Sequence, residues 1–189
     1  MTVTVGLVIL VVAATERELQ PVHGAETLCC GIGPVEAALQ TSRALANGPP
    51  DAVLHVGIAG ARSLAPLTVV LGSESVYCDV IDASSTLPRV ERVTPDAALL
   101  AAARGALPDG VVMPIGTCGR VGASTGCDVE AMEGFGVLRA AHLAGIPALE
   151  VRVISNAVDE PDRARWRISD ALARLGAVVP VLVESLAHT

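Results

Sequence analysis

Residues 128–162 read DVEAMEGFGVLRAAHLAGIPALEVRVISNAVDEPD and carry three successive signals of an α/β fold. A helix is predicted to begin at Met132-Glu133, where a thioether stands next to a carboxylate. A buried strand follows and ends in the polar pair Ser155-Asn156, before an acidic loop. Side chains at the carboxyl ends of strands face the ligand crevice in α/β proteins. We therefore expect this segment to supply half of a ligand pocket.

Length, charge and hydropathy fit one globular domain, 1–189. The chain is long enough for one good-sized domain and too short for two. It has 13 basic and 20 acidic residues, a net charge of −7 and no basic run, so nucleic acid is not an expected partner. The longest nearly apolar run, residues 5–14, is about half of the ~20 residues that a membrane span needs, and we expect no membrane partner.

The five cysteines contain no CxxC pair, and no histidine stands at a matching metal-ligand spacing. An odd number of cysteines in a chain of this length is typical of reduced, mostly buried thiols in a cytoplasmic protein. We therefore expect a cytoplasmic protein with no metal and no cofactor.

Strands and helices alternate along the chain. Aliphatic and β-branched runs predict strands at residues 3–13, 28–30, 52–56, 68–80 (one strand or a hairpin), 111–115 and 148–154. Helices are predicted at residues 15–21, 34–47, 95–106, 133–144 and 164–186, with a polar loop at 81–93 and a glycine-rich connection at 116–126. This alternation predicts one three-layer α/β/α domain around a central mixed, twisted sheet.

Two of the predicted helices show an apolar face. In the helix at 34–47 this face is formed by Val35, Ala38, Leu39 and Leu45. In the last helix it is formed by Ile168, Leu172, Leu175, Val179 and Leu182, with a bend expected at Pro180. We expect both faces to pack on the sheet.

Polar or glycine-rich residues follow three predicted strands. Glu16 and Glu18 come just after the first, where acidic residues also complement a helix dipole. The run 57–60, GIAG, follows another strand and is interpreted as a turn whose backbone amides can approach a ligand. The pair Ser155-Asn156 ends the third. Each feature alone has an ordinary structural explanation, and their joint order carries the argument.

Five segments stand in an order that resembles the purine nucleosidase and nucleoside phosphorylase superfamily. They are AATEREL (13–19), CGIGPVEAAL (30–39), HVGIAGAR (55–62), VEAMEGFG (129–136) and VRVISN (151–156). They span nearly the whole chain. The resemblance implies a nucleoside phosphorylase-like fold and an N-glycosidase.

Within the superfamily, three stretches look most like the futalosine hydrolase family: EAMEGFGV (130–137), GIPALEVRVISN (145–156) and RARW (163–166). This likeness implies hydrolysis of futalosine to hypoxanthine and dehypoxanthine futalosine, in menaquinone biosynthesis. It also implies a small-molecule nucleoside as the partner and a homo-oligomer, a dimer or larger, because the superfamily commonly assembles in this way.

The resemblance also implies roles for single residues. The general base that orients the attacking water falls on Glu18, with Glu16 as the alternative if the alignment shifts. Glu133 suits the ribose 2′- and 3′-hydroxyls, because an acceptor there stabilises positive charge on the oxocarbenium-like sugar. Met132 is expected to pack against the sugar face, and Arg152 to pair with a nearby carboxylate.

Asn156 departs from the nucleosidases that act on 6-aminopurines, which carry a carboxyl group at this position. An amide is no strong acid, but it offers an NH₂ donor and a carbonyl acceptor. The pair can donate to N7 or to the 6-oxo group and accept from a ring NH. Asn156 is therefore predicted as a catalytic residue that favours a 6-oxopurine. The same change from Asp can also accompany lost activity.

The stretch IGTCGRVG lacks the aromatic residue that stacks on the base in adenine-specific relatives. Base contact is then expected from Phe135, Trp166, the backbone or a neighbouring subunit. Trp166 suits a pocket wall and a helix-packing anchor equally well. Ile58, Gly60 and Ser155 complete the predicted substrate-binding residues.

Water is favoured over phosphate as the nucleophile. A phosphate user would place a hydroxyl where Ile58 and Ala59 stand, although Arg17 and Arg62 could reach an anion. The alternatives are a methylthioadenosine/S-adenosylhomocysteine nucleosidase, a purine nucleoside phosphorylase and a purine-binding protein that has lost turnover. These alternatives are distinguished by whether the reaction needs phosphate and by which base is released.

Overall fold

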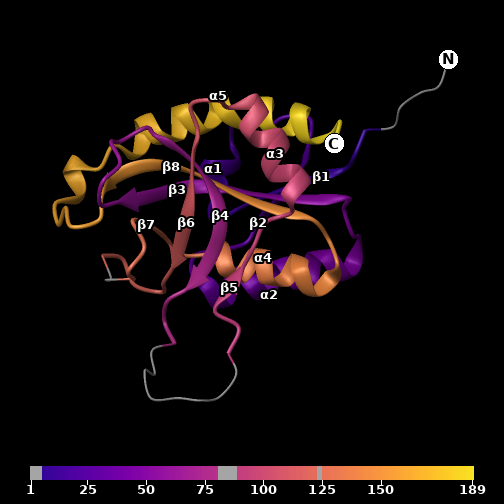
Figure 1. Cartoon of the computed structure of the whole chain (residues 1–189), viewed down its shortest axis with the longest axis horizontal. Helices are drawn as coiled ribbons and strands as arrows, with labels where there is room; N and C mark the ends of the chain where they lie inside the picture. The colour runs from indigo at the N-terminus through magenta and orange to yellow at the C-terminus, as the bar shows by residue number, and fades with distance from the viewer. Residues whose placement is uncertain (1–5, 81–88, 123–124) are drawn as a thin grey trace.

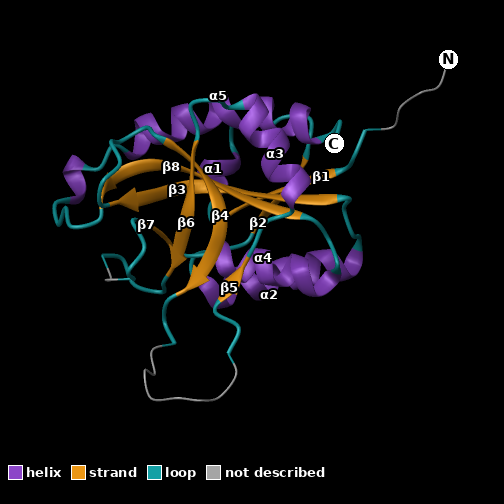
Figure 2. Ribbon diagram, viewed as in Figure 1, coloured by secondary structure: helices purple, strands orange, loops and turns teal. Residues whose placement is uncertain are grey.

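A mixed β-sheet forms the middle layer of the protein, and helices cover both of its faces (Figure 1, Figure 2). The computed structural model describes residues 6–80, 89–122 and 125–189. Within them the strands are β1 (Ile9–Ala13), β2 (Glu26–Cys29), β3 (Ala52–Ala61), β4 (Val69–Tyr77), β5 (Arg92–Val93), β6 (Val111–Thr117), β7 (Val129–Ala131) and β8 (Ala148–Ala157). The helices are α1 (Glu16–Leu19), α2 (Pro34–Asn47), α3 (Ala97–Ala106), α4 (Gly134–Ala144), the 3₁₀ turn η1 (Arg163–Arg165) and α5 (Ile168–Leu186). The predicted α/β/α fold is confirmed.

Five of the strands close into a ring. β3 pairs with β8, β8 with β4, β4 with β6, β6 with β7, and β7 returns to β3. β1 and β2 extend the sheet from β3 in parallel, and β5 pairs with β4. All five ring strands contribute to one small apolar core, formed by Ala59, Ala61, Val70, Ile115, Val129, Ala131 and Ile154. Closure leaves the ring strands without free edges and fixes the relative positions of their ends.

The helices bury the sheet on both sides. α5 and α3 cover one face and α2 and α4 the other (Figure 1). Successive side chains of β1 point to opposite faces of the sheet, and both faces are covered. Val11 packs in the core under α5, and Leu10 and Val12 pack in the core under α2 and α4. The prediction of a strand buried on both faces is therefore confirmed for β1, which begins at Ile9. Residues 3–5 of the predicted strand lie outside the described residues.

Residues 57–60 do not form the predicted glycine turn, because β3 continues to Ala61. The backbone there pairs with β8 along one edge. On the other edge Gly60 pairs with β7, and the N–H of Ile58 donates to Glu18. Gly57 is needed for close approach instead: a Cβ there would lie 2.3 Å from Arg152 Nη1 and 2.8 Å from Glu18 Oε1. The strand β8 likewise extends beyond residue 154 and includes Ser155 and Asn156.

The predicted apolar face of α2 is wrong in two positions, because Val35 and Leu39 are exposed. Leu45 of the predicted face is buried, and the helix also buries Ala37 and Thr41. Its N-terminus approaches α4 closely, where a Cβ at Gly136 would lie 2.5 Å from the Pro34 carbonyl oxygen.

Four further segments refine the predictions. The segment predicted as a strand or a hairpin is the single strand β4. The short strand β7 lies between the predicted glycine-rich connection and the predicted helix, where no element was predicted. The last helix begins at Ile168, after η1, and continues through Pro180. Most of the predicted polar loop at 81–93 lies outside the described residues, and its end forms β5.

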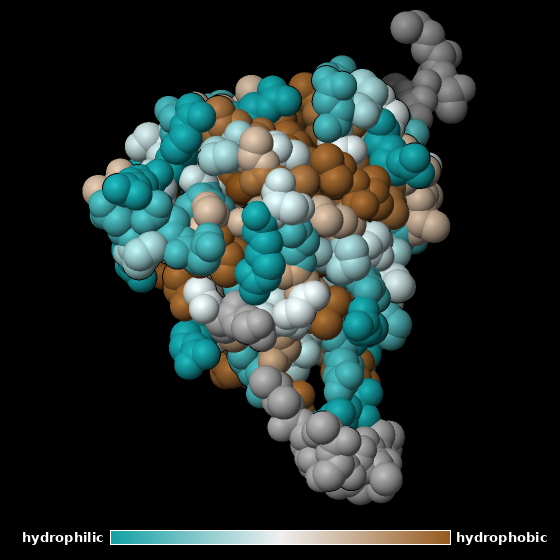
Figure 3. Space-filling view, turned by 60° about the vertical axis from the view of Figure 1, so that its left-hand side comes forward, coloured by the Kyte–Doolittle hydropathy of each residue, from teal (hydrophilic) through white to brown (hydrophobic). Residues whose placement is uncertain are grey.

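Some large apolar side chains reach the surface between hydrophilic ones, as Figure 3 shows for one face. Among the described residues the most exposed are Ile32, Val35, Leu39 and Leu143. In residues 6–80, 89–122 and 125–189, none of the helices is long and apolar enough to cross a membrane.

Candidate active site

A pocket of about 330 Å³ opens beside the carboxyl ends of β1, β3 and β8. Three other segments complete its wall: residues 120–122, β7 with the start of α4, and the start of α5. The polar side chains that line it are Thr15, Arg17, Glu18, Arg120, Glu130, Glu133, Ser155 and Asn156. The apolar ones include Ile32, Ile58, Val121, Met132, Val158, Trp166, Ile168 and Leu172. The site thus combines convergent carboxylates with an apolar wall, as small-molecule sites commonly do.

Glu18 is held firmly at the pocket although it belongs to a helix of one turn. Its Oε2 accepts hydrogen bonds from the backbone N–H and the hydroxyl of Thr15, at 3.0 and 2.8 Å. Its Oε1 accepts from the N–H of Ile58 at 3.0 Å. The side chain is buried and lines the pocket, whereas Glu16 is exposed and is absent from the lining. The structure therefore places Glu18, and not Glu16, where a ligand can contact it.

Glu133 stands at the N-cap position of α4, on another side of the same pocket. Its Oε1 accepts the N–H of Gly33 at 3.1 Å, and its Oε2 lies 3.5 Å from Arg152 Nη2. Burial raises the pKa of this carboxyl, and the charge of Arg152 and the Gly33 N–H oppose the rise. The carboxyl is therefore easier to protonate than an ordinary glutamate.

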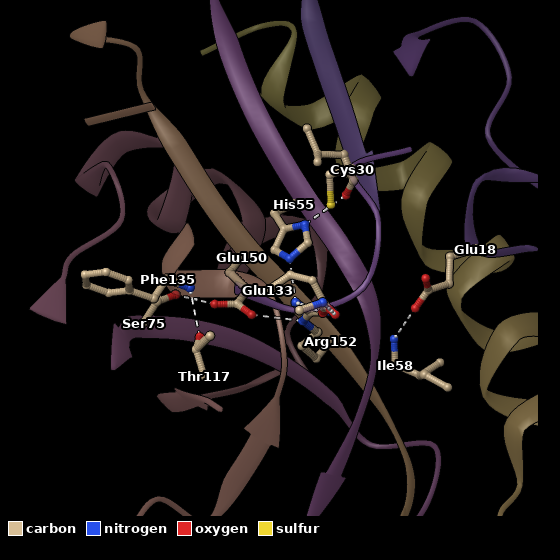
Figure 4. Close-up of polar contacts among 12 residues, drawn as sticks. Glu18, Cys30, His55, Ile58, Ser75, Thr117, Glu133, Phe135, Glu150 and Arg152 are labelled. Atoms are coloured by element: carbon tan, nitrogen blue, oxygen red, sulfur yellow. Dashed lines mark hydrogen bonds and ion pairs between the residues drawn. The ribbon is translucent and has the colours of Figure 1, made fainter. Parts of the chain in front are cut away.

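Arg152 is the centre of a buried network that reaches the pocket through Glu133 (Figure 4). Its Nε donates to Glu150 Oε1 at 2.9 Å, and its Nη2 donates to His55 Nε2. Since guanidinium groups only donate, His55 must carry its proton on Nδ1, which donates to the Val12 carbonyl at 3.0 Å. Burial, together with the charge of Arg152, lowers the pKa of His55 well below its usual value, so the ring is neutral.

Cys30 lies at the same buried centre (Figure 4). Burial, with the nearby charge of Glu133, raises the pKa of its thiol to about 12. A thiol with such a pKa is protonated at neutral pH and is a poor nucleophile. The pocket is therefore not a thiolate site.

Asn156 has a defined amide orientation. Its Nδ2 donates to the Ala157 carbonyl at 2.8 Å, and its Oδ1 accepts from the Ser155 hydroxyl at 2.7 Å. A carbonyl can only accept, so the NH₂ end must face Ala157. One N–H and one lone pair of the amide are left for a ligand.

The two candidate aromatic residues lie in different places. Trp166 lines the pocket, and its Nε1 donates to the Glu160 carbonyl at 3.0 Å. Phe135 does not line the pocket, because its ring stacks on Tyr77 with centroids 5.1 Å apart. The expected contact of Phe135 with the base is therefore not supported. Met132, Ile58, Gly60 and Ser155 all line the pocket.

Several lining residues were missed by the sequence reasoning, chiefly Glu130, Arg120 and Val121. Arg120 and Val121 belong to the stretch that was interpreted only as a glycine-rich connection. Glu130 lies three residues before Glu133. It belongs to a strand of three residues, which is too short to show an alternating apolar pattern. Arg62 pairs with Glu130, and Arg17 lines the pocket.

The described residues contain no group of three or more His, Cys, Asp or Glu side chains placed to hold a metal ion. What the pocket offers is three buried carboxylates from different elements, an oriented amide and an apolar wall. Such a site can bind a sugar with its hydroxyls, position a water and contact a polar base.

Comparisons with known proteins identify a family for this chain and match its fold. The Phosphorylase superfamily matches residues 21–184. The curated futalosine hydrolase of Streptomyces coelicolor is 35% identical over a match that covers 84% of this chain and 80% of that protein. The S-adenosylhomocysteine nucleosidase of Streptococcus pyogenes, solved with 5-methylthiotubericidin, has a TM-score of 0.85 at 22% identity and covers 98% of this chain and 99% of its own. A futalosine hydrolase mutant of Helicobacter pylori has a TM-score of 0.84 at 17% identity, over 93% and 98%.

Proposed function

The chain belongs to the phosphorylase superfamily, and from that membership we propose that it is an N-glycosidase that hydrolyses futalosine and releases hypoxanthine. The 35% identity to the Streptomyces coelicolor futalosine hydrolase supports the choice of substrate. The observation that carries the proposal is the convergence of Glu18, Glu133 and Asn156 on one pocket. The proposed reaction belongs to menaquinone biosynthesis.

Glu133 holds the sugar. Its carboxylate receives one N–H from Gly33 and faces Arg152, which leaves lone pairs for the ribose 2′- and 3′-hydroxyls. These hydrogen bonds strengthen as positive charge develops on the sugar, so they favour the transition state over the ground state. Met132 packs against the sugar face from the neighbouring position of the pocket wall.

Glu18 orients the water. A carboxylate has about four lone-pair sites, and three of them are occupied by Thr15 and Ile58. The remaining site lies on Oε1 and accepts a proton of the attacking water. Three fixed bonds also hold the carboxylate in place, which preorganises the water before the bond breaks.

Asn156 contacts the base. The N–H left over by Ala157 can donate to N7 or to the 6-oxo group of the leaving purine, and the remaining lone pair of Oδ1 can accept from a ring NH. A donor at N7 assists departure of the base, because negative charge grows on the ring as the bond to the sugar breaks. Donation to the 6-oxo group and acceptance of the N1–H favour hypoxanthine over adenine, whose 6-amino group cannot accept and whose N1 carries no hydrogen.

The reaction is tested with purified protein and three nucleosides: futalosine, inosine and methylthioadenosine, each with and without phosphate. Release of hypoxanthine from futalosine without phosphate, followed by chromatography, is the expected result. Adenine release would support a methylthioadenosine/S-adenosylhomocysteine nucleosidase, the activity of several structural neighbours. Strict dependence on phosphate would support a phosphorylase, and a bound purine without any product would support a binding protein.

Two neighbouring glutamates make a matched pair of variants. Glu18→Gln is expected to lower kcat by about 10²–10⁴, which is the range of a general acid or base. Glu16→Gln, two residues away and exposed, is expected to leave kcat within twofold of the wild type. Equal losses in both variants would contradict the role of Glu18.

The protein is further proposed to work in the cytoplasm as a homo-oligomer. Five free cysteines suit a reducing compartment. Ile32, Val35 and Leu39 are 64%, 67% and 62% exposed, and Ile32 also borders the pocket. An assembly that covers this surface would bury it beside the substrate. Light scattering of the wild type against Leu39→Glu measures the mass, and a monomeric wild type contradicts the proposal.

A further inference from the structure

His55 is a fully buried histidine of β3 that does not line the pocket (Figure 4). Its Nδ1 donates to the Val12 carbonyl at 3.0 Å, and its Nε2 accepts from Arg152 Nη2. Both nitrogens of the neutral ring are therefore used. A ligand in the pocket does not reach this side chain, so any effect of His55 on the reaction must pass through Arg152.

Two residues tether the guanidinium of Arg152, and a third stands further away. Nε donates to Glu150 Oε1 at 2.9 Å, and Nη2 donates to His55. Glu150 is itself fixed, because Ser75 donates to its Oε2. Glu133 Oε2 lies 3.5 Å from Nη2, beyond the about 2.7–2.9 Å of a charge-assisted hydrogen bond. The guanidinium is thus bonded to Glu150 and His55, and only its charge acts on Glu133.

This separation leaves one oxygen of Glu133 without a hydrogen bond. Oε1 accepts from the N–H of Gly33 at 3.1 Å, whereas Oε2 forms no hydrogen bond to any residue that the structure describes. Oε2 is not sealed inside the protein, since Thr41 Oγ1 is the sole fully buried, unpartnered side-chain atom of the described part. Because Glu133 lines the pocket, Oε2 is open to a ligand there.

We propose that His55 is a positioning residue, which holds the Arg152 guanidinium short of a hydrogen bond with Glu133 and so keeps Glu133 Oε2 available for the sugar hydroxyls. The inference rests on the proposed function, in which Glu133 binds the sugar. A guanidinium bonded to Oε2 would occupy an acceptor that the sugar needs. A more distant guanidinium would leave a buried carboxylate without a compensating charge. The tethered position supplies the charge and leaves the acceptor unoccupied.

Substitution of His55 by a neutral residue changes no charge around Glu133. The ionisable groups around Glu133 and Arg152 come from β8, α1, β3 and the residue after β2: they are Arg152, Glu150, Glu18, His55 and Cys30. Arg152 is the cation among them, and the imidazole and the thiol are uncharged. A change in the pKa of Glu133 in such a variant therefore reports a movement of the guanidinium.

A purely structural role of His55 makes a different prediction, and two substitutions separate the roles. Gln places an acceptor near the position of Nε2 and can still bond to Arg152, whereas the shorter Asn places its NH₂ near Nδ1 and can still bond to Val12. Each variant thus keeps one of the two bonds. If His55 only stabilises the sheet, the Glu133 carboxyl titrates alike in both.

The test is an NMR titration of the Glu133 carboxyl carbon in the ligand-free full chain, with the signal assigned by Glu133→Gln. In His55→Leu and His55→Asn the released N–H of Arg152 is expected to turn to Glu133 Oε2. A hydrogen bond to the charged form lowers the pKa of a carboxyl, so Glu133 should titrate at a lower pH than in the wild type. His55→Gln should restore the wild-type titration. The Asn and Gln variants keep a polar group at the site and decide the question even where the Leu variant does not fold.

Kinetics give a second readout. The kcat/KM for futalosine divided by that for 2′-deoxyfutalosine reports the bond between Glu133 and the 2′-hydroxyl. This ratio is expected to fall at least about tenfold in His55→Asn, the range of one hydrogen bond to a charged group, and to recover in His55→Gln. An unchanged ratio in His55→Asn overturns the proposal.

Any result in which Glu133 of the Asn variant does not titrate below that of the Gln variant also overturns it. The titration needs no substrate, so the two proposals fail separately. The expected titrations without hydrolysis of futalosine sink the nucleosidase and leave His55 in place, whereas hydrolysis with equal titrations does the reverse.

Discussion

Replacement of Arg152 by Met tests the buried network beneath the pocket. Arg152 is 1% exposed, and its guanidinium bonds to Glu150, which is 0% exposed, and to His55, and faces Glu133. Met fills a similar length of space but supplies no charge and no donor. The substitution therefore leaves two buried carboxylates without their cation.

The expected loss of stability follows from this burial. Breaking a buried ion pair by removing one partner costs about 3–5 kcal/mol, a large share of the 5–15 kcal/mol that typically stabilises a domain. In a chain of this size each kcal/mol lowers Tm by about 2–4 °C, so Arg152→Met should lower Tm by roughly 6–20 °C. Adding Glu150→Gln removes the uncompensated charge, and the double variant should regain at least about 1 kcal/mol.

Urea unfolding followed by circular dichroism measures the change. Arg167→Met is the matched control, because Arg167 also pairs with a carboxylate at 2.8 Å, but in a pair whose side chains are 50% and 54% exposed. An exposed pair contributes at most about 1 kcal/mol. If Arg152→Met costs no more than Arg167→Met, the argument from buried charge is wrong.

Three further predictions concern the site. The plot of kcat/KM against pH should fall on the acid side with a midpoint above 4.5, because Glu133 must be ionised to accept from the sugar and burial raises its pKa. Arg152→Met removes the charge that opposes this rise and should move the midpoint higher. A midpoint below 4.5 in the wild type would count against this role of Glu133. Asn156→Asp should raise the kcat/KM for 6-amino relative to 6-oxo nucleosides at least about tenfold, and an unchanged ratio would remove Asn156 from base recognition. Gly57→Ala should destabilise the protein by about 1–3 kcal/mol in urea unfolding, since its Cβ would lie 2.3 Å from Arg152 Nη1. Gly105→Ala is the control, because no atom lies within 4 Å of its added Cβ, and it should be neutral or stabilising. Equal effects of the two substitutions would refute the steric argument.

The order of the elements could be predicted because local pattern determines it. β1, β3 and β8 are aliphatic runs that are buried on both faces, and such runs read as strands without any tertiary information. The side of α2 that packs could not be read in this way, since Val35 and Leu39 are as apolar as the residues that the helix buries. Which side of α2 is buried is set by its packing against α4 and the sheet, which no local pattern encodes.

Part of the pocket could be predicted for a similar reason. Glu18 follows the first strand and Glu133 begins a helix, so their positions follow from the ends of elements. Glu130 could not be found, because β7 has three residues and pairs with β3 and β6, which are far away in sequence. Only the closed ring brings it beside Gly60.

The place of Asn156 in the pocket depends on a shift in strand register that no pattern of apolar residues reveals. The pairing of β3 with β8 runs regularly to Ala59 and Ile154 and then shifts, so that Gly60 is opposite Asn156. Without the shift Gly60 would face Ser155, and Asn156 would face Ala61, which points into the core of the ring. The extra residue, Ser155, also donates to the amide of Asn156. One irregularity in the strand therefore brings the amide to the pocket face, and the choice of purine that we assign to Asn156 depends on it.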